Sequence, residues 1–142
     1  MKKNKCLHLI PENLPLLPSE DSWKKMYEAQ AILQERLGRS ALSRASDMQK
    51  KCLMIIEEIY HMNAELVEML DRLPYKHWKK YREHETKDWI SEDQRIETLF
   101  EYVDALHFFM NIGLILGFSP EEVFYYYECK NKENHDRQDR GY

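Results

Sequence analysis

Glycine and cysteine are scarce in this 142-residue chain, which contains four of the first and three of the second. The cysteines, Cys6, Cys52 and Cys129, are odd in number, lie far apart and form no C-x-x-C pair. This pattern argues against a disulfide framework or a zinc knuckle, and it favours a reducing cytoplasm. The chain also has no G-x-x-x-x-G-K-[ST], G-x-G-x-x-G, G-x-S-x-G or H-E-x-x-H pattern. P-loop, Rossmann, serine hydrolase and zincin chemistry therefore have no support.

The chain has no excess of positive charge and no long apolar segment at its start. Its net charge is −4 and its isoelectric point is about 5.9, so it has no general attraction to nucleic acid. The first apolar stretch is short and is broken by Pro11, Glu12 and Pro15, whereas a membrane-spanning helix needs roughly 20 apolar residues. We therefore predict neither a nucleic-acid partner nor a membrane partner.

No Val/Ile/Thr-rich alternating run indicates a β-strand. The sequence therefore predicts an all-α fold, which we expect to be an antiparallel helical bundle. Its length and its 43% hydrophobic content fit one domain, which we place at residues 22–142 after an irregular, proline-containing arm over residues 1–21.

Capping patterns and glycines set the expected helix boundaries. Gly38 and Gly117 are stop signals, and the S-x-x-[EQ] patterns that begin at Ser46, Ser91 and Ser119 are start signals. The expected helices cover residues 22–37, 46–73, 91–117 and 119 onwards. The segment 75–90 is interpreted as a loop or short helix at the mouth of a site. In the first helix, helical spacing predicts an inward face with Met26, Ala29 or Gln30, and Leu33.

Two pairs of acids interrupt otherwise apolar helices. Glu65 and Glu68 lie in the second expected helix, and Glu101 and Asp104 lie in the third. A spacing of three residues puts both carboxylates of a pair on one side of a helix, about one turn apart. The third helix has no Lys or Arg after Arg95 to neutralise its pair, and carboxylates are rarely buried without a positive partner. Facing pairs would place four carboxylates without basic partners in one cleft, which suits a hard divalent cation.

Each acidic residue taken alone could also be an ordinary surface residue without a metal. The chain has 25 acids, and a Glu on a helix is usually solvated. Glu57 and Glu58 could join a metal-binding face with His61 and Glu65, but we place both at the solvent edge. His107 is interpreted as a hydrogen-bonded core histidine and not as a ligand.

Basic, amide and aromatic residues lie in two further places. Trp78 and Lys79 follow the second helix, where an indole could stack on a base and an ammonium group could meet a phosphate. Near the end of the chain, Lys130, Asn134 and Arg137 combine phosphate-binding groups with an amide that can hydrogen-bond a base edge. An ordinary surface anchor explains the first group equally well. A solvated helix end or a disordered tail explains the second.

Four motifs together carry a family resemblance: ELVE at 65–68, WK at 78–79, EYVDALHF at 101–108 and KNKENHDRQDRGY at 130–142. In this combination the chain resembles the all-α nucleoside triphosphate pyrophosphohydrolases. It is most similar to their dimeric dUTPase branch, which includes phage dCTP pyrophosphatases. The resemblance covers roughly residues 22–142.

The resemblance implies a homodimeric enzyme that hydrolyses dUTP, dCTP or both to the monophosphate and pyrophosphate. Two or three Mg²⁺ ions, with Mn²⁺ as a substitute, would be held by four acids: Glu65, Glu68, Glu101 and Asp104. A metal-bound water would attack the α-phosphorus, and Glu65 or Glu68 would orient or deprotonate it.

The same resemblance implies a set of nucleotide-binding residues. The base would face Gln30 and Asn134 and pack near Trp78, and the phosphates would meet Lys79, Lys130 and Arg137. The alternatives are a house-cleaning pyrophosphatase for other or modified deoxynucleotides, and a catalytically silent nucleotide-binding module.

Overall fold

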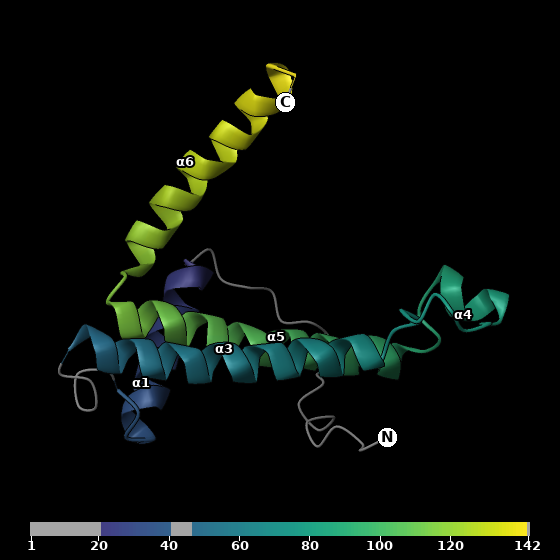
Figure 1. Ribbon diagram of the computed structural model, residues 1–142, viewed down its shortest axis with the longest axis horizontal. Helices are drawn as coiled ribbons and strands as arrows, with labels where there is room; N and C mark the ends of the chain where they lie inside the picture. The colour runs from purple at the N-terminus through teal and green to yellow at the C-terminus, as the bar shows by residue number, and fades with distance from the viewer. Residues whose placement is uncertain (1–20, 41–46, 142) are drawn as a thin grey trace. The chain divides into compact units, whose positions relative to one another are not determined.

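The computed structural model describes residues 21–40 and 47–141 of the chain. Its helices are α1 (Ser22–Arg36), α3 (Met48–Asp71), α4 (Glu83–Lys87), α5 (Glu92–Leu116) and α6 (Pro120–Asp139) (Figure 1). No strand occurs among the described residues, and the all-α prediction is confirmed. Except for Asp21, the predicted arm lies outside these residues, as does Ser46 of the second capping pattern.

The helices belong to two compact units, and α3 and α5 contribute to both. The described part of the first unit is Ile55–Phe109. The second unit comprises Ser19–Met54 and Met110–Tyr142, of which the structure describes 21–40, 47–54 and 110–141. A single domain over residues 22–142 stays a prediction.

Several helix ends follow the local signals in the sequence. The Asp21 carboxylate accepts a hydrogen bond from the backbone N–H of Lys24 at 3.0 Å and caps α1. Gly38 follows the end of α1 with a φ of 64°, a left-handed conformation that glycine adopts without steric cost. Ser119 and Glu122 form the predicted capping box of α6, with hydrogen bonds of 3.1 and 2.9 Å.

The longer helices begin and end close to their predicted limits. The side chain of Asp47 accepts a hydrogen bond from the backbone of Lys50 at 2.9 Å at the start of α3, which ends two residues before the predicted limit. The Ser91 hydroxyl accepts from the backbone of Gln94 at 3.1 Å at the start of α5. α4 provides the short helix that was one interpretation of segment 75–90. α6 is helical as far as Asp139, so the interpretation of its last turns as a disordered tail is wrong.

In the first unit, α3 and α5 lie side by side and run antiparallel (Figure 1). The His61 ring stacks on Phe108 with a centroid distance of 5.4 Å. Farther along the chain, just after α3, Arg72 pairs with Glu97 of α5. As the residue number increases from His61 to Arg72, the number of the partner on α5 decreases from Phe108 to Glu97, as expected for antiparallel segments. A complete antiparallel bundle stays a prediction.

In the second unit, α1 packs against the last part of α5 through Tyr27 and Gln30, its two buried residues. The Tyr27 hydroxyl donates a hydrogen bond to the carbonyl of Phe118 at 3.0 Å. The same hydroxyl lies against Gly113, where a Cβ atom would clash with it. The close approach of α1 to α5 therefore depends on a glycine in the middle of an apolar helix.

The predicted inward face of α1 is partly wrong. Met26 and Leu33 are exposed. Of the two alternatives Ala29 and Gln30, Gln30 is the buried residue. The buried face is rotated towards Tyr27 because its hydroxyl finds a backbone acceptor. Hydrophobic spacing alone could not give this orientation, since Met26 and Tyr27 are both apolar enough to face a core.

The stretch Glu83–Leu116 is long and apolar enough to cross a membrane by length and composition alone. The core helix of a soluble protein passes the same test, so this is weak evidence for a membrane span. The absence of a membrane partner stays a prediction.

Candidate metal centre

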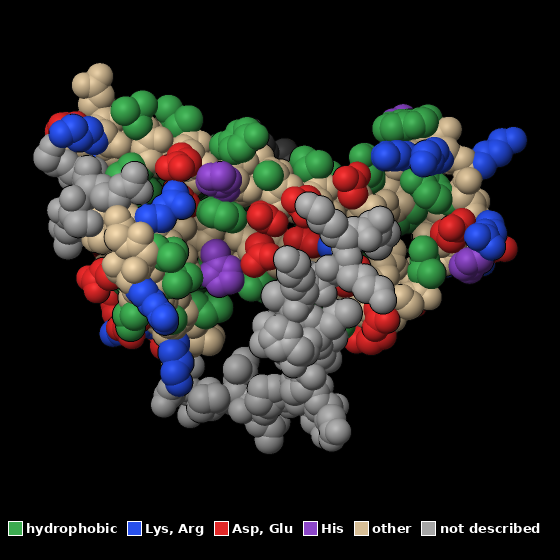
Figure 2. Space-filling view, turned by 90° about the horizontal axis from the view of Figure 1, so that it is seen from below, with side chains coloured by type: hydrophobic (Ala, Val, Ile, Leu, Met, Phe, Trp, Pro, Cys, Tyr) green, Lys and Arg blue, Asp and Glu red, His purple; other side chains and the backbone are tan. Residues whose placement is uncertain are grey.

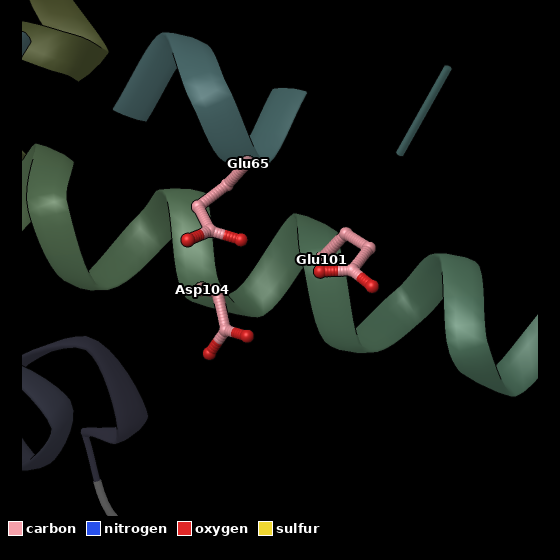
Figure 3. A group of neighbouring side chains, drawn as sticks. All are labelled: Glu65, Glu101 and Asp104. Carbon is pink, nitrogen blue, oxygen red and sulfur yellow. The ribbon is translucent and has the colours of Figure 1, made fainter. Parts of the chain in front are cut away.

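Three carboxylates of the first unit converge, Glu65 from α3 and Glu101 and Asp104 from α5 (Figure 3). One oxygen atom of each lies within 4.8 Å of the others. Acidic side chains also gather on the molecular face shown in Figure 2. Carboxylate oxygens are the ligands that Mg²⁺ and Mn²⁺ prefer. The donor set therefore fits a hard divalent cation.

The Glu65 carboxyl is strongly perturbed by this arrangement. Its pKa is raised from 4.5 to about 7. Partial burial is the largest cause, and the negative charges of Asp104, Glu68 and Glu101 add to it. A bound cation would relieve this repulsion, because its charge favours the ionised carboxylates.

Asp104 lies at the open side of the group, and 53% of its side chain is exposed. Partial burial raises the pKa of its carboxyl, although the neighbouring His107 opposes the shift and Glu101 adds to it. His107 Nδ1 lies 3.7 Å from an Asp104 oxygen, and 42% of its side chain is exposed. The interpretation of His107 as a core histidine is therefore wrong. The face of α5 that bears His107 and Asp104 is exposed to solvent, although most residues of this helix are apolar.

Glu101 has a basic partner, contrary to the expectation of acids without one. The Arg72 guanidinium donates to Glu101 Oε1 through Nε, at 3.0 Å, and through Nη2. It donates to Glu97 Oε2 through Nη1. Sequence reasoning missed Arg72 because it precedes Glu101 by 29 positions and belongs to no motif. The only local signal was Glu97, one helical turn before Glu101 on the same face.

The remaining acids of α3 divide between buried and exposed positions. Glu68 lies one turn after Glu65, is exposed, and does not belong to the group of three. Its charge nevertheless reaches the group, because it raises the pKa of Glu65. Glu57 is exposed as predicted. The placement of Glu58 at the solvent edge is wrong, since only 2% of this residue is exposed.

Gln30, the predicted base-binding residue of α1, is buried in the second unit. Its Nε2 donates to Asn111 Oδ1 at 2.7 Å, and Asn111 is also buried. Sequence reasoning missed Asn111, although a single amide in the apolar half of α5 was a usable signal. The pair fixes the orientation of two amides, which can present both donors and acceptors.

Trp78 and Lys79 lie in the segment between α3 and α4. The Trp78 indole is exposed and meets the rings of Tyr75 and His77 edge to face, with centroid distances of 6.4 and 5.0 Å. Lys79 lines a cavity of about 390 Å³ whose wall also includes Arg72. The structure therefore brings Lys79 to the same cavity as the residue that pairs with Glu101.

Lys130, Asn134 and Arg137 lie on α6 at spacings of four and three, so they share one helix face. Lys130 and Asn134 are exposed. Arg137 Nε donates to Glu133 Oε1 at 3.2 Å within the same helix. The predicted residues form one stripe on a solvent-facing helix.

The sequence matches the dUTPase family over residues 22–116. The chain belongs to the dUTPase family. The match confirms the family resemblance. No solved structure matches the chain.

Curated relatives of this dUTPase-family chain come from phages. It is 34% identical to the dCTP pyrophosphatase of Enterobacteria phage T4 over an alignment of 169 positions, gaps included, that covers 98% of each chain. It is 51% identical over 72 residues to the dCTP pyrophosphatase of Enterobacteria phage LZ5, covering 48% of this chain and 41% of that protein. A DNA replication protein of Enterobacteria phage T4 is 32% identical over an alignment of 159 positions, gaps included, that covers 91% of this chain and 40% of that protein.

The matched family range includes all three clustered acids, Glu68 and Gln30. It ends before the stripe of α6, although the similarity to the T4 protein extends over nearly the whole chain. The acidic centre is thus part of the shared dUTPase region.

Proposed function

We propose that the protein is a divalent-metal-dependent pyrophosphohydrolase of pyrimidine deoxynucleoside triphosphates. Water adds to the α-phosphorus of dCTP, dUTP or both, the bond to the bridging oxygen breaks, and the products are the monophosphate and pyrophosphate. The convergence of Glu65, Glu101 and Asp104 in a dUTPase-family chain carries this proposal. The phage relatives named dCTP pyrophosphatase support dCTP as a substrate, and the family description supports dUTP.

The four predicted acids would hold two or three Mg²⁺ ions, for which Mn²⁺ could substitute. Ions bound there lower the pKa of water and offset the negative charge on the phosphates. Glu65 or Glu68 would orient the attacking water or take its proton, because both belong to the acidic pair of α3 beside the metal site. Glu68 stands one turn away and completes the ligand set.

The remaining predicted residues bind the nucleotide. Gln30, fixed by its hydrogen bond to Asn111, and Asn134 bind the pyrimidine edge, and Trp78 packs near it. Phosphates meet the ammonium and guanidinium groups of Lys79, Lys130 and Arg137. An Asn or Gln amide satisfies either cytosine or uracil after a flip, so these residues fit both bases.

The assembly that we propose is a cytoplasmic homodimer with no nucleic-acid or membrane partner. Support for self-association comes from large apolar side chains that are exposed along the two long helices, among them Leu53, Ile56, Ile59, Tyr60, Val67, Leu99, Tyr102 and Phe109. Many large apolar side chains exposed on one helix favour such an interaction.

The metal ligands provide the first test. We expect Asp104→Asn or Glu68→Gln to lower turnover by at least about 10²-fold, the scale for losing one key electrostatic group. Asp93→Asn, an exposed acid on the same helix as Asp104, is the matched control and should keep full activity. Full activity in both ligand variants would refute the assignment.

The substrate is tested by Mg²⁺-dependent pyrophosphate release from dUTP, dCTP, dTTP, dATP and UTP. Preference for dCTP or dUTP supports the proposal. Preference for dATP points to a house-cleaning enzyme with a wider pocket. No release from any triphosphate points to a silent nucleotide-binding module.

A further inference from the structure

The hydrogen bonds from Arg72 to Glu101 reach only one of the two carboxylate oxygens. Nε and Nη2 of the guanidinium both donate to Oε1, and neither uses Oε2. The third hydrogen bond, from Nη1, goes to Glu97. Arg72 thus binds Glu101 through Oε1 alone, and Oε2 of Glu101 makes no hydrogen bond with the guanidinium.

Burial strengthens the hydrogen bonds that Arg72 makes with Glu97 and Glu101. The side chains of Arg72, Glu97 and Glu101 are only 11%, 12% and 7% exposed. Charge-assisted hydrogen bonds are stronger where water is excluded, and the planar guanidinium fixes the direction of each bond. Arg72 is held in turn, because Gln94 Nε2 donates to its backbone carbonyl at 2.6 Å. The Glu101 carboxylate is therefore fixed before any ion arrives.

Glu97 balances the charge of this arrangement. An arginine beside a metal ligand would by itself cancel the negative charge that attracts the cation. With Glu97 included, two carboxylates and one guanidinium leave a net charge of −1. Glu101 is oriented by a positive group and still presents negative charge.

We propose that Arg72 and Glu97 are positioning residues that hold Glu101 ready for the divalent cation. The inference rests on the proposed metal site and adds two residues to it. Groups that orient a metal ligand typically change metal affinity by about 10- to 100-fold when they are replaced. A purely structural ion pair would change folding stability and leave the affinity of the folded protein unaltered.

The test is the dissociation constant of Mn²⁺ for the full chain, from electron paramagnetic resonance of free Mn²⁺. Arg72→Lys keeps the charge but loses the planar fork, and Glu97→Gln keeps the shape but loses the balancing charge. We expect both variants to bind Mn²⁺ about 10- to 100-fold more weakly. Arg95→Lys is the matched control. Arg95 makes a similar contact with Glu92, but at a more exposed position of α5, the helix that also bears Glu97 and Glu101.

Thermal unfolding in EDTA identifies which variants are folded, and Glu97→Gln decides the matter if Arg72→Lys does not fold. A folded variant should recover turnover in excess Mg²⁺, because its defect lies in affinity. Wild-type affinity in the folded variants would overturn the inference and leave the proposed function intact. A wild-type chain that binds no Mn²⁺ would overturn both.

Discussion

Crowding of carboxylates around Glu65 makes the metal-free site sensitive to pH. Its carboxyl titrates near 4.5 when the chain is unfolded and near 7 when it is folded. Between these values the folded chain binds more protons, so this group lowers the free energy of unfolding as the pH rises from about 4.5 to about 7. The contribution is lost in Glu65→Gln, which does not titrate.

We therefore predict that Glu65→Gln gains stability relative to the wild type between about pH 5 and about pH 8, when urea unfolding is measured in EDTA. Asp93→Asn, at an exposed acid of α5 outside the acidic group, is the control and should show no such gain. An unchanged difference between Glu65→Gln and wild type at the two pH values would show that the site is not crowded.

At the scale of residues, the sequence predicted neighbours along one helix better than partners across two. The spacing of Glu101 and Asp104 follows from the helical period alone. The contacts of Arg72 and the burial of Glu58 depend on the register between segments, which no local pattern sets. The exposed position of Asp104 was missed for the same reason.

At the scale of elements, the docking of α1 depends on the contact between Tyr27 and Gly113. We predict that Gly113→Ala destabilises the protein by about 1–3 kcal/mol, the cost of overpacking a well-packed contact. The Tyr27→Phe background should reduce this cost, because the nearest remaining ring atom, Cζ, would lie 3.3 Å from the added methyl. Urea unfolding of the four proteins gives the coupling free energy. Strict additivity would mean that the two residues do not meet.

The stripe on α6 gives a second prediction at this scale. Truncation after Cys129 should abolish nucleotide turnover, because it removes Lys130, Asn134 and Arg137. Mn²⁺ affinity should stay at the wild-type value, since the clustered acids lie on α3 and α5. Circular dichroism should report only the loss of the deleted turns. Near-normal turnover would make the end of α6 an ordinary solvated helix.

Helix ends were predictable to within about two residues wherever a side chain caps the backbone locally, as at Ser91 and Ser119. A helical end was one of two interpretations of residues 130–139, because their polar composition also fits a disordered tail. Ion pairs one turn apart, such as Lys132 with Asp136, support the helical state. The rotation of α1 depended on a hydrogen bond between elements that are distant in the sequence.

At the scale of the whole molecule, we predict a homodimer with twice the chain mass of 17.3 kDa in light scattering coupled to size exclusion. Exposed apolar side chains on α3 and α5 give the physical reason. Tyr60→Glu, which adds charge to an exposed apolar position on α3, should shift the equilibrium towards the monomer. A wild-type mass of one chain at micromolar concentration would contradict the prediction.

The all-α class was predictable because it depends on composition and periodicity, which a sequence displays directly. The choice between dCTP and dUTP was not, because both bases satisfy the same amides. Both the preferred nucleotide and the bond that is cleaved must be measured on the reaction itself.

The most direct measurement is hydrolysis of dCTP and dUTP with Mg²⁺ in ¹⁸O-labelled water, followed by mass spectrometry of the products. Attack at the α-phosphorus predicts one labelled oxygen in the monophosphate and unlabelled pyrophosphate. Asp104→Asn should form neither product at an appreciable rate. Stepwise release of labelled single phosphates would contradict the account.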